Sequence, residues 1–205
     1  MDIKQISNKL KDQLLAVKPS RDWTMEYRPC QVKLKNGEIL DRVYLSASEP
    51  YMRTWGVMPD QDSGKKYVLI EDVEEIKESP YRMPVHLANK LYKAGESGMG
   101  YCLYKMQFDN GKTIEVSSGN AVDFPPIPNG LKSENIKDVF PHEGSRKNPI
   151  NSHDYTWCLF KWEIPEIGKE ETTANIDYTS MAADVQPDKM VPKSNFWSKL
   201  KSLWS

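Results

Sequence analysis

Two Asn-Gly pairs, each set within alternating apolar and polar residues, constrain the fold of this chain more than any other feature. The first pair, Asn36-Gly37, lies within residues 30–45, and the second, Asn110-Gly111, lies within residues 101–116. Alternation with a period of two is typical of β-strands, and Asn-Gly is the preferred pair for a type I′ hairpin turn, in which both residues need a positive φ. The sequence therefore predicts two β-hairpins.

Further apolar runs extend each hairpin into a small β-rich unit. Residues 66–70 predict a third strand after the first hairpin, and Val73 and Ile76 continue it into a short strand or turn. Residues 121–124 extend the second unit, and residues 155–162 form its final strong strand. This order of elements is typical of small SH3-like or Sm-like barrels, an analogy of pattern that carries no function.

The two units also resemble each other in sequence. Residues 32–38 and 106–112 are alternating strands that end in Asn-Gly, and residues 70–73 faintly match residues 136–139. Because any two hairpins with the same turn chemistry look alike, we favour independent hairpins over an internal duplication. The arrangement of strands around the two turns separates these interpretations.

Two further helices complete an α+β organisation. Residues 2–17 place apolar side chains on a narrow stripe before Pro19, and residues 84–94 form a helix between Pro84 and Gly95. We expect an N-terminal helix (1–20), a first β-rich unit (21–83), a bridging helix (84–95), a second β-rich unit (96–164), a flexible acidic linker (165–193) and an amphipathic terminal helix (194–205).

Composition and charge restrict the class of protein. The formal net charge is −1, from 28 basic and 29 acidic residues, so no basic field exists to hold nucleic acid and we expect none as a partner. The 3 cysteines form no C-x-x-C pair, and no run approaches the ~20 apolar residues that span a bilayer. The N-terminus has no apolar core of signal-peptide length. These features favour a cytoplasmic protein with reduced thiols.

The C-terminal segment is the strongest candidate for contact with another molecule. Phe196, Trp197, Leu200, Leu203 and Trp204 share one face of a helix, with lysines and serines on the other. Burying each large side chain is worth roughly 1.5–3 kcal/mol, so this face should pack on the protein itself, in a partner's groove or on a membrane surface. A helix this short gives only weak, reversible membrane attachment.

A second candidate is the loop formed by residues 50–59. Tyr51, Arg53 and Trp55 alternate there between prolines and a glycine. These residue types are enriched at interface hot spots, and a loop presents them without filling a core. The competing interpretation is that Tyr51 and Trp55 close one end of a barrel.

The glycine-rich turn at residues 95–102 is the candidate for a small ligand. Glu96 and Ser97 lie in this turn, Cys102 starts the next strand, and His142 lies elsewhere in the chain. The turn follows a helix and leads into a strand, unlike a phosphate-binding Walker loop, and no neighbour supplies a base for the thiol. No spacing typical of a zinc or calcium site occurs. We therefore expect no catalytic residue, metal or cofactor.

These observations together predict a non-catalytic protein-interaction module, such as an adaptor, an inhibitor or an immunity-type binder. Its partner would be another protein, bound by the aromatic loop and the tethered C-terminal helix. One alternative is a peripheral membrane protein anchored by that helix. Another is a small hydrolase or nucleotide-binding enzyme built on the turn at residues 95–102.

Overall fold

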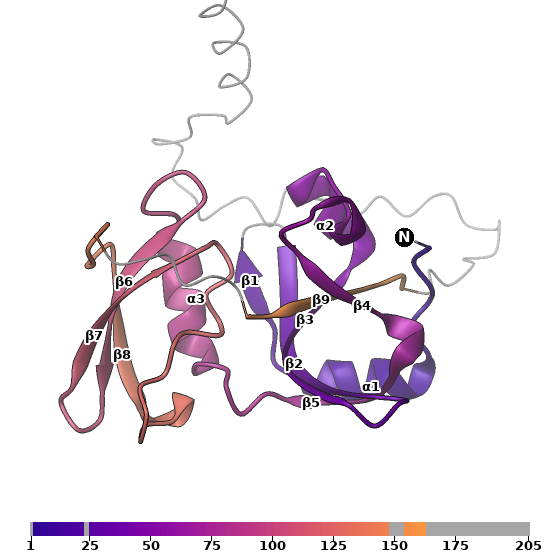
Figure 1. Ribbon diagram of the computed structural model, residues 1–205, viewed down its shortest axis with the longest axis horizontal. Helices are drawn as coiled ribbons and strands as arrows, with labels where there is room; N and C mark the ends of the chain where they lie inside the picture. Colours follow the sequence, from indigo (N-terminus) through magenta and orange to yellow (C-terminus); the bar gives the residue numbers. More distant parts are fainter. Residues whose placement is uncertain (1, 23–24, 148–153, 163–205) are drawn as a thin grey trace, which may run out of the picture. The chain divides into compact units, whose positions relative to one another are not determined.

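The computed structural model describes residues 2–22, 25–147 and 154–162 (Figure 1). These residues form a mixed α+β structure with a sheet-rich core and belong to one compact unit, residues 1–163. The predicted linker at residues 165–193 and the predicted terminal helix at residues 194–205 lie outside the described residues. The aromatic face of that helix therefore stays a prediction.

A six-stranded mixed sheet forms the larger part of the unit. Its strands are β1 (Ser20–Asp22), β2 (Met25–Leu34), β3 (Ile39–Ala47), β4 (Lys66–Leu69), β5 (Val73–Glu78) and β9 (Thr156–Phe160). The order is β1-β2-β3-β9-β4, and β5 pairs with the second half of β2. The first three strands are antiparallel, whereas β9 runs parallel to both β3 and β4.

Strand β9 corrects the expected division into two β-rich units. The sequence placed residues 155–162 in the second unit, but β9 lies between β3 and β4 of the six-stranded sheet. Trp157 and Leu159 belong to one hydrophobic core, and Cys158 and Phe160 to another. A parallel strand buried on both faces shows a continuous apolar run, so its sequence gives no indication of which sheet it joins.

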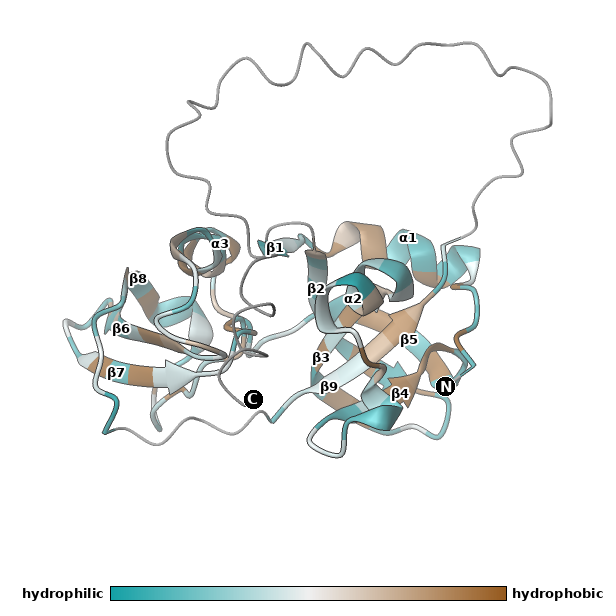
Figure 2. Cartoon of the chain, turned by 90° about the horizontal axis from the view of Figure 1, so that it is seen from above, coloured by the Kyte–Doolittle hydropathy of each residue, from teal (hydrophilic) through white to brown (hydrophobic). Residues whose placement is uncertain are grey.

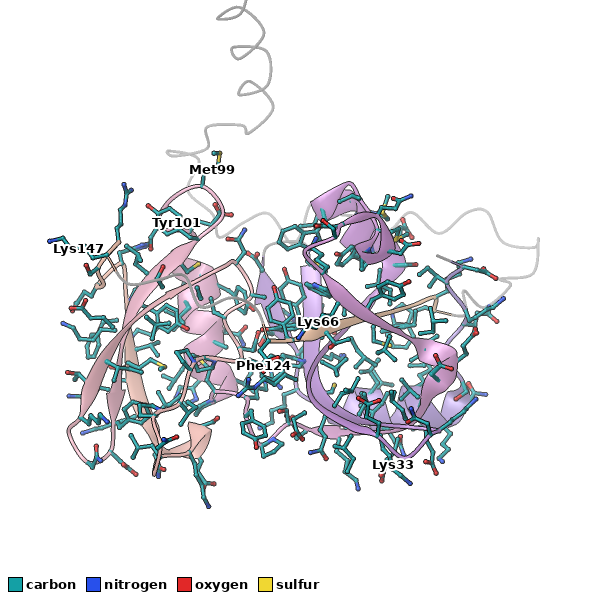
Figure 3. All side chains as sticks on the ribbon, viewed as in Figure 1. Lys33, Lys66, Met99, Tyr101, Phe124 and Lys147 are labelled. Carbon is teal, nitrogen blue, oxygen red and sulfur yellow. The ribbon has the colours of Figure 1, made fainter. Side chains whose placement is uncertain are left out.

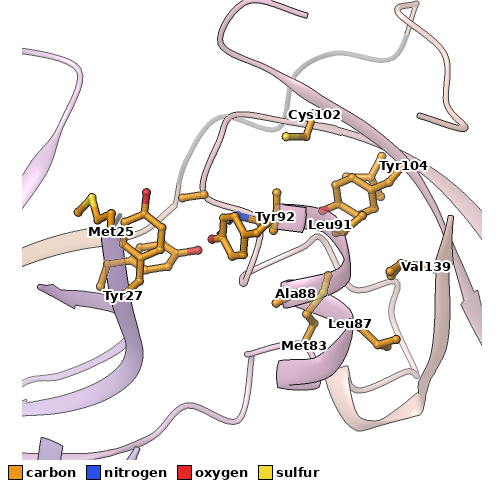
Figure 4. Packing of buried hydrophobic residues seen from close by; sticks show 14 of the residues in the cluster. Met25, Tyr27, Met83, Leu87, Ala88, Leu91, Tyr92, Cys102, Tyr104 and Val139 are labelled. Atoms are coloured by element: carbon orange, nitrogen blue, oxygen red, sulfur yellow. Dashed lines mark hydrogen bonds between the residues drawn. The ribbon is translucent and has the colours of Figure 1, made fainter. Parts of the chain in front are cut away.

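The two faces of the six-stranded sheet have different coverings. On one face, Val32, Val43 and Leu45 pack with Leu10 and Leu14 of α1 (Asn8–Ala16), whose mixed apolar and polar surface is visible in Figure 2. On the other face, the tyrosines of β2 and β3 share a core with α3 (Val85–Ala94). Figure 4 shows the contact, where Tyr27 of β2 and Tyr92 of α3 face each other with ring centroids 5.7 Å apart.

A three-stranded antiparallel sheet completes the unit. It is formed by β6 (Cys102–Phe108), β7 (Thr113–Ser118) and β8 (Ile136–Pro141), in the order β7-β6-β8. Residues 121–124, expected to continue this sheet, form no strand, because the backbone amides of Val122 and Asp123 donate to the hydroxyls of Tyr92 and Tyr44 instead. A 3-10 turn at Ser133–Asn135 leads directly into β8.

Both predicted hairpins are present and are closed by the same hydrogen bonds. The amide of Gly37 donates to the carbonyl of Leu34 over 2.9 Å, and the amide of Gly111 donates to Phe108 over 3.0 Å. Each glycine has a positive φ, of 90° and 82°, but neither preceding asparagine does, so the turns are not type I′. Each asparagine instead accepts the amide two residues ahead, a local bond that stabilises a longer hairpin turn.

The similarity continues beyond the hairpins. A 3-10 turn, η2 (Ile70–Asp72) or η3 (Ser133–Asn135), precedes a third strand that pairs with the first strand of its hairpin. Leu34 pairs with Val73, and Phe108 pairs with Ile136. The same three-stranded motif thus occurs twice. In the structure Val73 corresponds to Ile136, whereas the sequence had matched Ile136 with Ile70, three residues earlier. Neither sheet closes into a barrel within the described residues, so SH3-like or Sm-like units are not confirmed.

Both predicted helices form, with one corrected boundary. The helix α3 ends at Gly95, whose φ of 80° suits a glycine. The N-terminal helix starts at Asn8 rather than at residue 2, because the side chain of Ser7 accepts the amide of Leu10 and caps it. Residues 2–6 form no helix, and Gln5 forms a parallel bridge to Lys161.

Candidate functional site

The aromatic segment around Tyr51 is a helix and not the expected loop. Residues Ser48–Trp55 form α2, which ends at Gly56 with a φ of 70°. Helical spacing places Tyr51 and Trp55 on one face, so Tyr51 is fully buried and Trp55 is half-buried. Arg53 lies in solvent and pairs with Glu49 over 3.0 Å. The proline in the first turn fits a helix, a signal that the sequence interpretation passed over.

The helix α2 packs these rings onto an aromatic cluster. Trp157 of β9 is 1 % exposed, and its ring lies 4.9 Å from Tyr51 and 5.3 Å from Tyr44. The cluster consists of Tyr27, Tyr44, Tyr51, Trp55, Phe124, Tyr155 and Trp157. Within the described residues, the indole nitrogens of Trp55 and Trp157 have no hydrogen-bond partner, although each is buried. Each such group costs about 1–3 kcal/mol.

Lys65 packs against the edge of the aromatic cluster. The Lys65 ammonium lies 4.4 Å from the ring centroid of Trp55 and donates a hydrogen bond to the hydroxyl of Tyr51 over 3.0 Å. It also pairs with Asp62 over 3.3 Å, and the Lys65 side chain is only 17 % exposed. The field of an aromatic face favours a cation, so the ring of Trp55 fixes a positive charge beside the cluster.

A cavity of about 280 Å³ opens at this point, and we call it the Trp55 pocket. Its walls include Trp55, Lys65, Lys66, Gly100, Asn120 and Tyr155. The pocket therefore joins the end of the aromatic helix to the glycine-rich turn, which the sequence had offered as two separate candidates. Lysines 65 and 66 and Asn120 are wall residues that the sequence interpretation did not select.

Glu96 links the glycine-rich turn to this pocket. One carboxylate oxygen accepts the amide of Gly100 over 3.1 Å, and the other accepts the side-chain amide of Asn120 over 2.9 Å. The side-chain oxygen of Asn120 is buried and has no hydrogen-bond partner among the described residues. Glu96 thus acts as a positioning residue, while Met99 at the exposed end of the turn is 87 % exposed (Figure 3).

Ser97 and His142 come together on the other side of the turn. The Ser97 hydroxyl lies 2.9 Å from Nδ1 of His142, accepts the amide of Leu103 over 2.9 Å and lies 3.3 Å from its carbonyl. The backbone amide of His142 also donates to the carbonyl of Leu103 over 2.8 Å. A serine nucleophile needs a base that a third group orients, and no described residue bonds to the other ring nitrogen. The pair fastens the turn to β6.

Cys102 has the properties of a structural thiol. Its side chain is 8 % exposed, and burial, with a smaller effect of the charge on Glu96, raises its pKa to about 11. A thiol with that pKa is almost entirely protonated near pH 7 and is a poor nucleophile. Among the described residues, no three His, Cys, Asp or Glu side chains are grouped closely enough to hold a metal ion.

A buried polar network lies behind the aromatic cluster and was not anticipated from the sequence. Asp123 is fully buried, 3.5 Å from Arg82 in an ion pair, and accepts hydrogen bonds from the hydroxyls of Ser20 and Tyr92. Its backbone amide donates to the Tyr44 hydroxyl over 3.0 Å. Burial raises the pKa of Asp123, and the charge of Arg82 opposes that rise. A single aspartate among loop residues gives no sequence signal for such a network.

Comparison with known proteins adds no information on this site. No known protein family, curated protein or solved structure matches the chain. In the part of the chain that the structure describes, no helix is both long and apolar enough to cross a membrane.

Proposed function

We propose that this protein is a non-catalytic binding protein whose Trp55 pocket receives a short segment of a partner polypeptide. The observation that carries the proposal is the composition of the pocket. Aromatic faces, two lysines and a buried amide oxygen without a partner meet around one cavity. Tryptophan and tyrosine are enriched among the few residues that supply most of the binding energy at protein interfaces.

The size of the pocket is compatible with side chains of a polypeptide. Sites for drug-sized ligands and cofactors usually enclose about 300–1,000 Å³ and bury most of the ligand. The Trp55 pocket encloses about 280 Å³. That volume suits one or two side chains of a segment whose remaining atoms lie outside the pocket.

The electrostatics of the pocket supports an acidic segment. Lys65 and Lys66 line the pocket, and Asp62 is the acidic residue on its wall. Lys66 is exposed, with 67 % of its side chain accessible, so a ligand reaches its ammonium group without displacing the core. A carboxylate that binds between the two lysines would form charge-assisted hydrogen bonds, which are about twice as strong as neutral ones.

The glycine-rich turn supports binding rather than catalysis. Ser97 is occupied by the backbone of β6, the thiol of Cys102 is protonated near neutral pH, and Glu96 holds Asn120. None of these groups combines a free nucleophile with an oriented base. In this proposal, the turn forms one wall of the binding site.

A selection experiment with the full chain tests the proposal. Peptides from a phage-displayed random library are selected on the wild-type protein, and their dissociation constants are measured for Trp55→Leu and Lys65→Met. Because hot-spot residues contribute more than ~1 kcal/mol, we expect affinity to fall at least about fivefold for each. Lys33→Ala is the matched control, since Lys33 is an exposed lysine on β2 whose partner is Glu74.

Two outcomes would contradict the proposal. One is a set of selected peptides whose affinity is the same for wild type and for both pocket variants. The other is hydrolysis of generic ester substrates that disappears in Ser97→Ala, which would favour the enzyme alternative. Deleting residues 194–205 tests separately whether the C-terminal segment supplies a second contact.

A further inference from the structure

The Trp55 pocket is one of three hollows that share wall residues. The middle hollow, of about 520 Å³, shares Lys66 with the Trp55 pocket. The third, of about 540 Å³, shares Arg42 and Tyr81 with the middle one. Because each hollow shares a wall side chain with the next, the three lie next to one another in a row. We call this row the Lys66 track.

The chemistry of the track changes from one end to the other. The Trp55 end carries Lys65 and Lys66 beside aromatic rings. The middle is lined by charged residues of both signs, and Asp154 there pairs with both Lys66 and Arg42. The far end combines apolar walls, which are Pro80, Tyr81, Ile127, Pro128 and Leu131, with polar ones, which are Arg42, Asn129, Lys132, Ser133 and Glu134.

Sheet geometry gives the length of the middle section. Lys66 pairs with Thr156, and Thr156 pairs with Val43, the neighbour of Arg42 in β3. Adjacent strands lie about 4.8 Å apart, so Lys66 and the Arg42 region are separated by roughly 10 Å. An extended polypeptide covers that distance in about three residues. The far end of the track begins directly beside Arg42, because the ring of Tyr81 lies 4.9 Å from the Arg42 guanidinium group.

We infer that the Lys66 track binds an extended peptide with an acidic residue at one end and an apolar residue about three to five positions away. This inference rests on the proposed function and adds the sequence pattern of the partner. The acidic side chain lies between Lys65 and Lys66 in the Trp55 pocket. The chain crosses the polar middle section, and the apolar side chain packs against Tyr81 and Leu131.

The position of Asp62 provides a sharp test of the acidic end. Asp62 pairs with Lys65 over 3.3 Å and would compete with a carboxylate of the peptide. Its other oxygen accepts the amide of Gly64 over 3.1 Å, a bond that asparagine also makes. Asp62→Asn therefore removes the competing charge while keeping the local turn.

The experiment uses the full chain and peptides selected on the wild-type protein. The inference predicts peptides that share the stated pattern. It also predicts affinity that rises about twofold to fivefold in Asp62→Asn and falls about fivefold in Lys66→Ala and in Tyr81→Ala, in the range of exposed ion pairs and partly buried contacts. Peptide variants with the acid changed to its amide should lose the effects of Asp62→Asn and Lys66→Ala and keep that of Tyr81→Ala.

The controls separate a failure of this inference from a failure of the proposed function. Tyr67→Ala removes an exposed tyrosine of β4 that lines none of the three hollows, and should leave affinity unchanged. If Trp55→Leu weakens binding but Tyr81→Ala and Asp62→Asn do not change it, the pocket binds peptides and the extended track is wrong. If no variant matters, both proposals fail.

Discussion

The two three-stranded motifs have the same scaffold and differ in one segment. In the motif of β2, β3 and β5, residues 48–69 separate the second strand from its 3-10 turn and contain α2 and β4. In the motif of β6, β7 and β8, residues 119–132 fill the same place without a helix or strand. We call these stretches the first and second inserted segments.

Most wall residues of the Trp55 pocket lie in these inserted segments. The first supplies Trp55, Lys65 and Lys66, and the second supplies Asn120 to the Trp55 pocket and Leu131 to the far end of the track. Hairpin hydrogen bonds, by contrast, are the same in both motifs. The comparison indicates that the repeated strands are a scaffold, and that the Trp55 pocket depends on what each motif carries between them.

The inserted segments are also held in place by different means. The first is anchored by aromatic rings around Trp157, where two indole nitrogens have no partner among the described residues. The second is anchored by Asp123, whose carboxylate oxygens both accept hydrogen bonds. The carboxylate of Asp123 is thus satisfied, although Nε of its partner Arg82 has no hydrogen-bond partner among the described residues. Of the two indoles, Trp55 is the one that lines the Trp55 pocket.

Among the substitutions that test this comparison, Asp123→Ala should lower the free energy of unfolding the most. The substitution removes the buried one of the two carboxylates that pair with Arg82, and it removes the acceptor of the Ser20 and Tyr92 hydroxyls. Breaking a buried pair in this way costs about 3–5 kcal/mol of unfolding free energy. We expect the lower end of the range, because Glu78 stays 3.3 Å from Arg82. Urea denaturation of wild type and Asp123→Ala measures this loss of unfolding free energy.

Asp138→Ala is the matched control for that substitution. Asp138 also pairs with a basic residue, Lys90, over 2.8 Å, but its side chain is 38 % exposed. Exposed pairs contribute about 0–1 kcal/mol, so this variant should be nearly as stable as wild type. If both variants lost the same free energy, the buried network would not be the anchor of the second inserted segment.

A smaller effect, equal in the two motifs, is expected from Gly37→Ala and Gly111→Ala. Both glycines have a positive φ, and an added Cβ meets no atom within 4 Å at either position. The cost is therefore conformational only, at about 1–2 kcal/mol for a left-handed residue. Urea denaturation of both variants should give values that agree within ~0.5 kcal/mol, the usual error for independent sites.

Gly64→Ala controls for the loss of a glycine as such. Gly64 has no positive φ, and its added Cβ would lie at 3.4 Å from Asp62, an ordinary contact. We expect a change of less than about 0.5 kcal/mol there. Clearly unequal costs at Gly37 and Gly111 would show that the two hairpins are not equivalent, whatever their hydrogen bonds.

Local signals in the sequence were sufficient for the hairpins and for the helix before Gly95. Asn36-Gly37 and Asn110-Gly111 act within a few residues, and so do Pro84 and Gly95, so their structures could be predicted without knowing the fold. The turn type was wrong because the asparagine side chain, rather than a positive φ, stabilises the turn.

Long-range features were not available from one sequence. The position of β9 between β3 and β4 depends on pairing between residues more than a hundred positions apart. The Trp55 pocket likewise needs Trp55 and Asn120 from separate motifs, so the sequence offered its two sides as unrelated candidates. Asp123 was missed because nothing near it in the chain identifies Ser20, Arg82 or Tyr92 as partners.

The smallest expected effect, and the one most specific to this comparison, is the opposite pH dependence of two carboxylates. Burial raises the pKa of Asp123 above its usual 3.8, so the folded state holds that proton more tightly than the unfolded chain. Its contribution to stability is therefore greatest at low pH and decreases as pH rises from about 3.8 through the folded-state pKa. Measured against Asp123→Asn, wild type should lose free energy of unfolding over that interval.

The pKa of Asp138 has the opposite shift, because the hydrogen bond from Lys90 lowers it below 3.8. Its contribution is present above pH 3.8 and is lost as pH falls through the lower folded-state value, by less than about 1 kcal/mol for so exposed a pair. Unfolding curves of wild type, Asp123→Asn and Asp138→Asn between pH 3 and pH 7 show whether each carboxylate makes the protein more or less stable as pH rises. If wild type gained stability with rising pH relative to Asp123→Asn, the charge of Arg82 would outweigh burial in setting the pKa of Asp123.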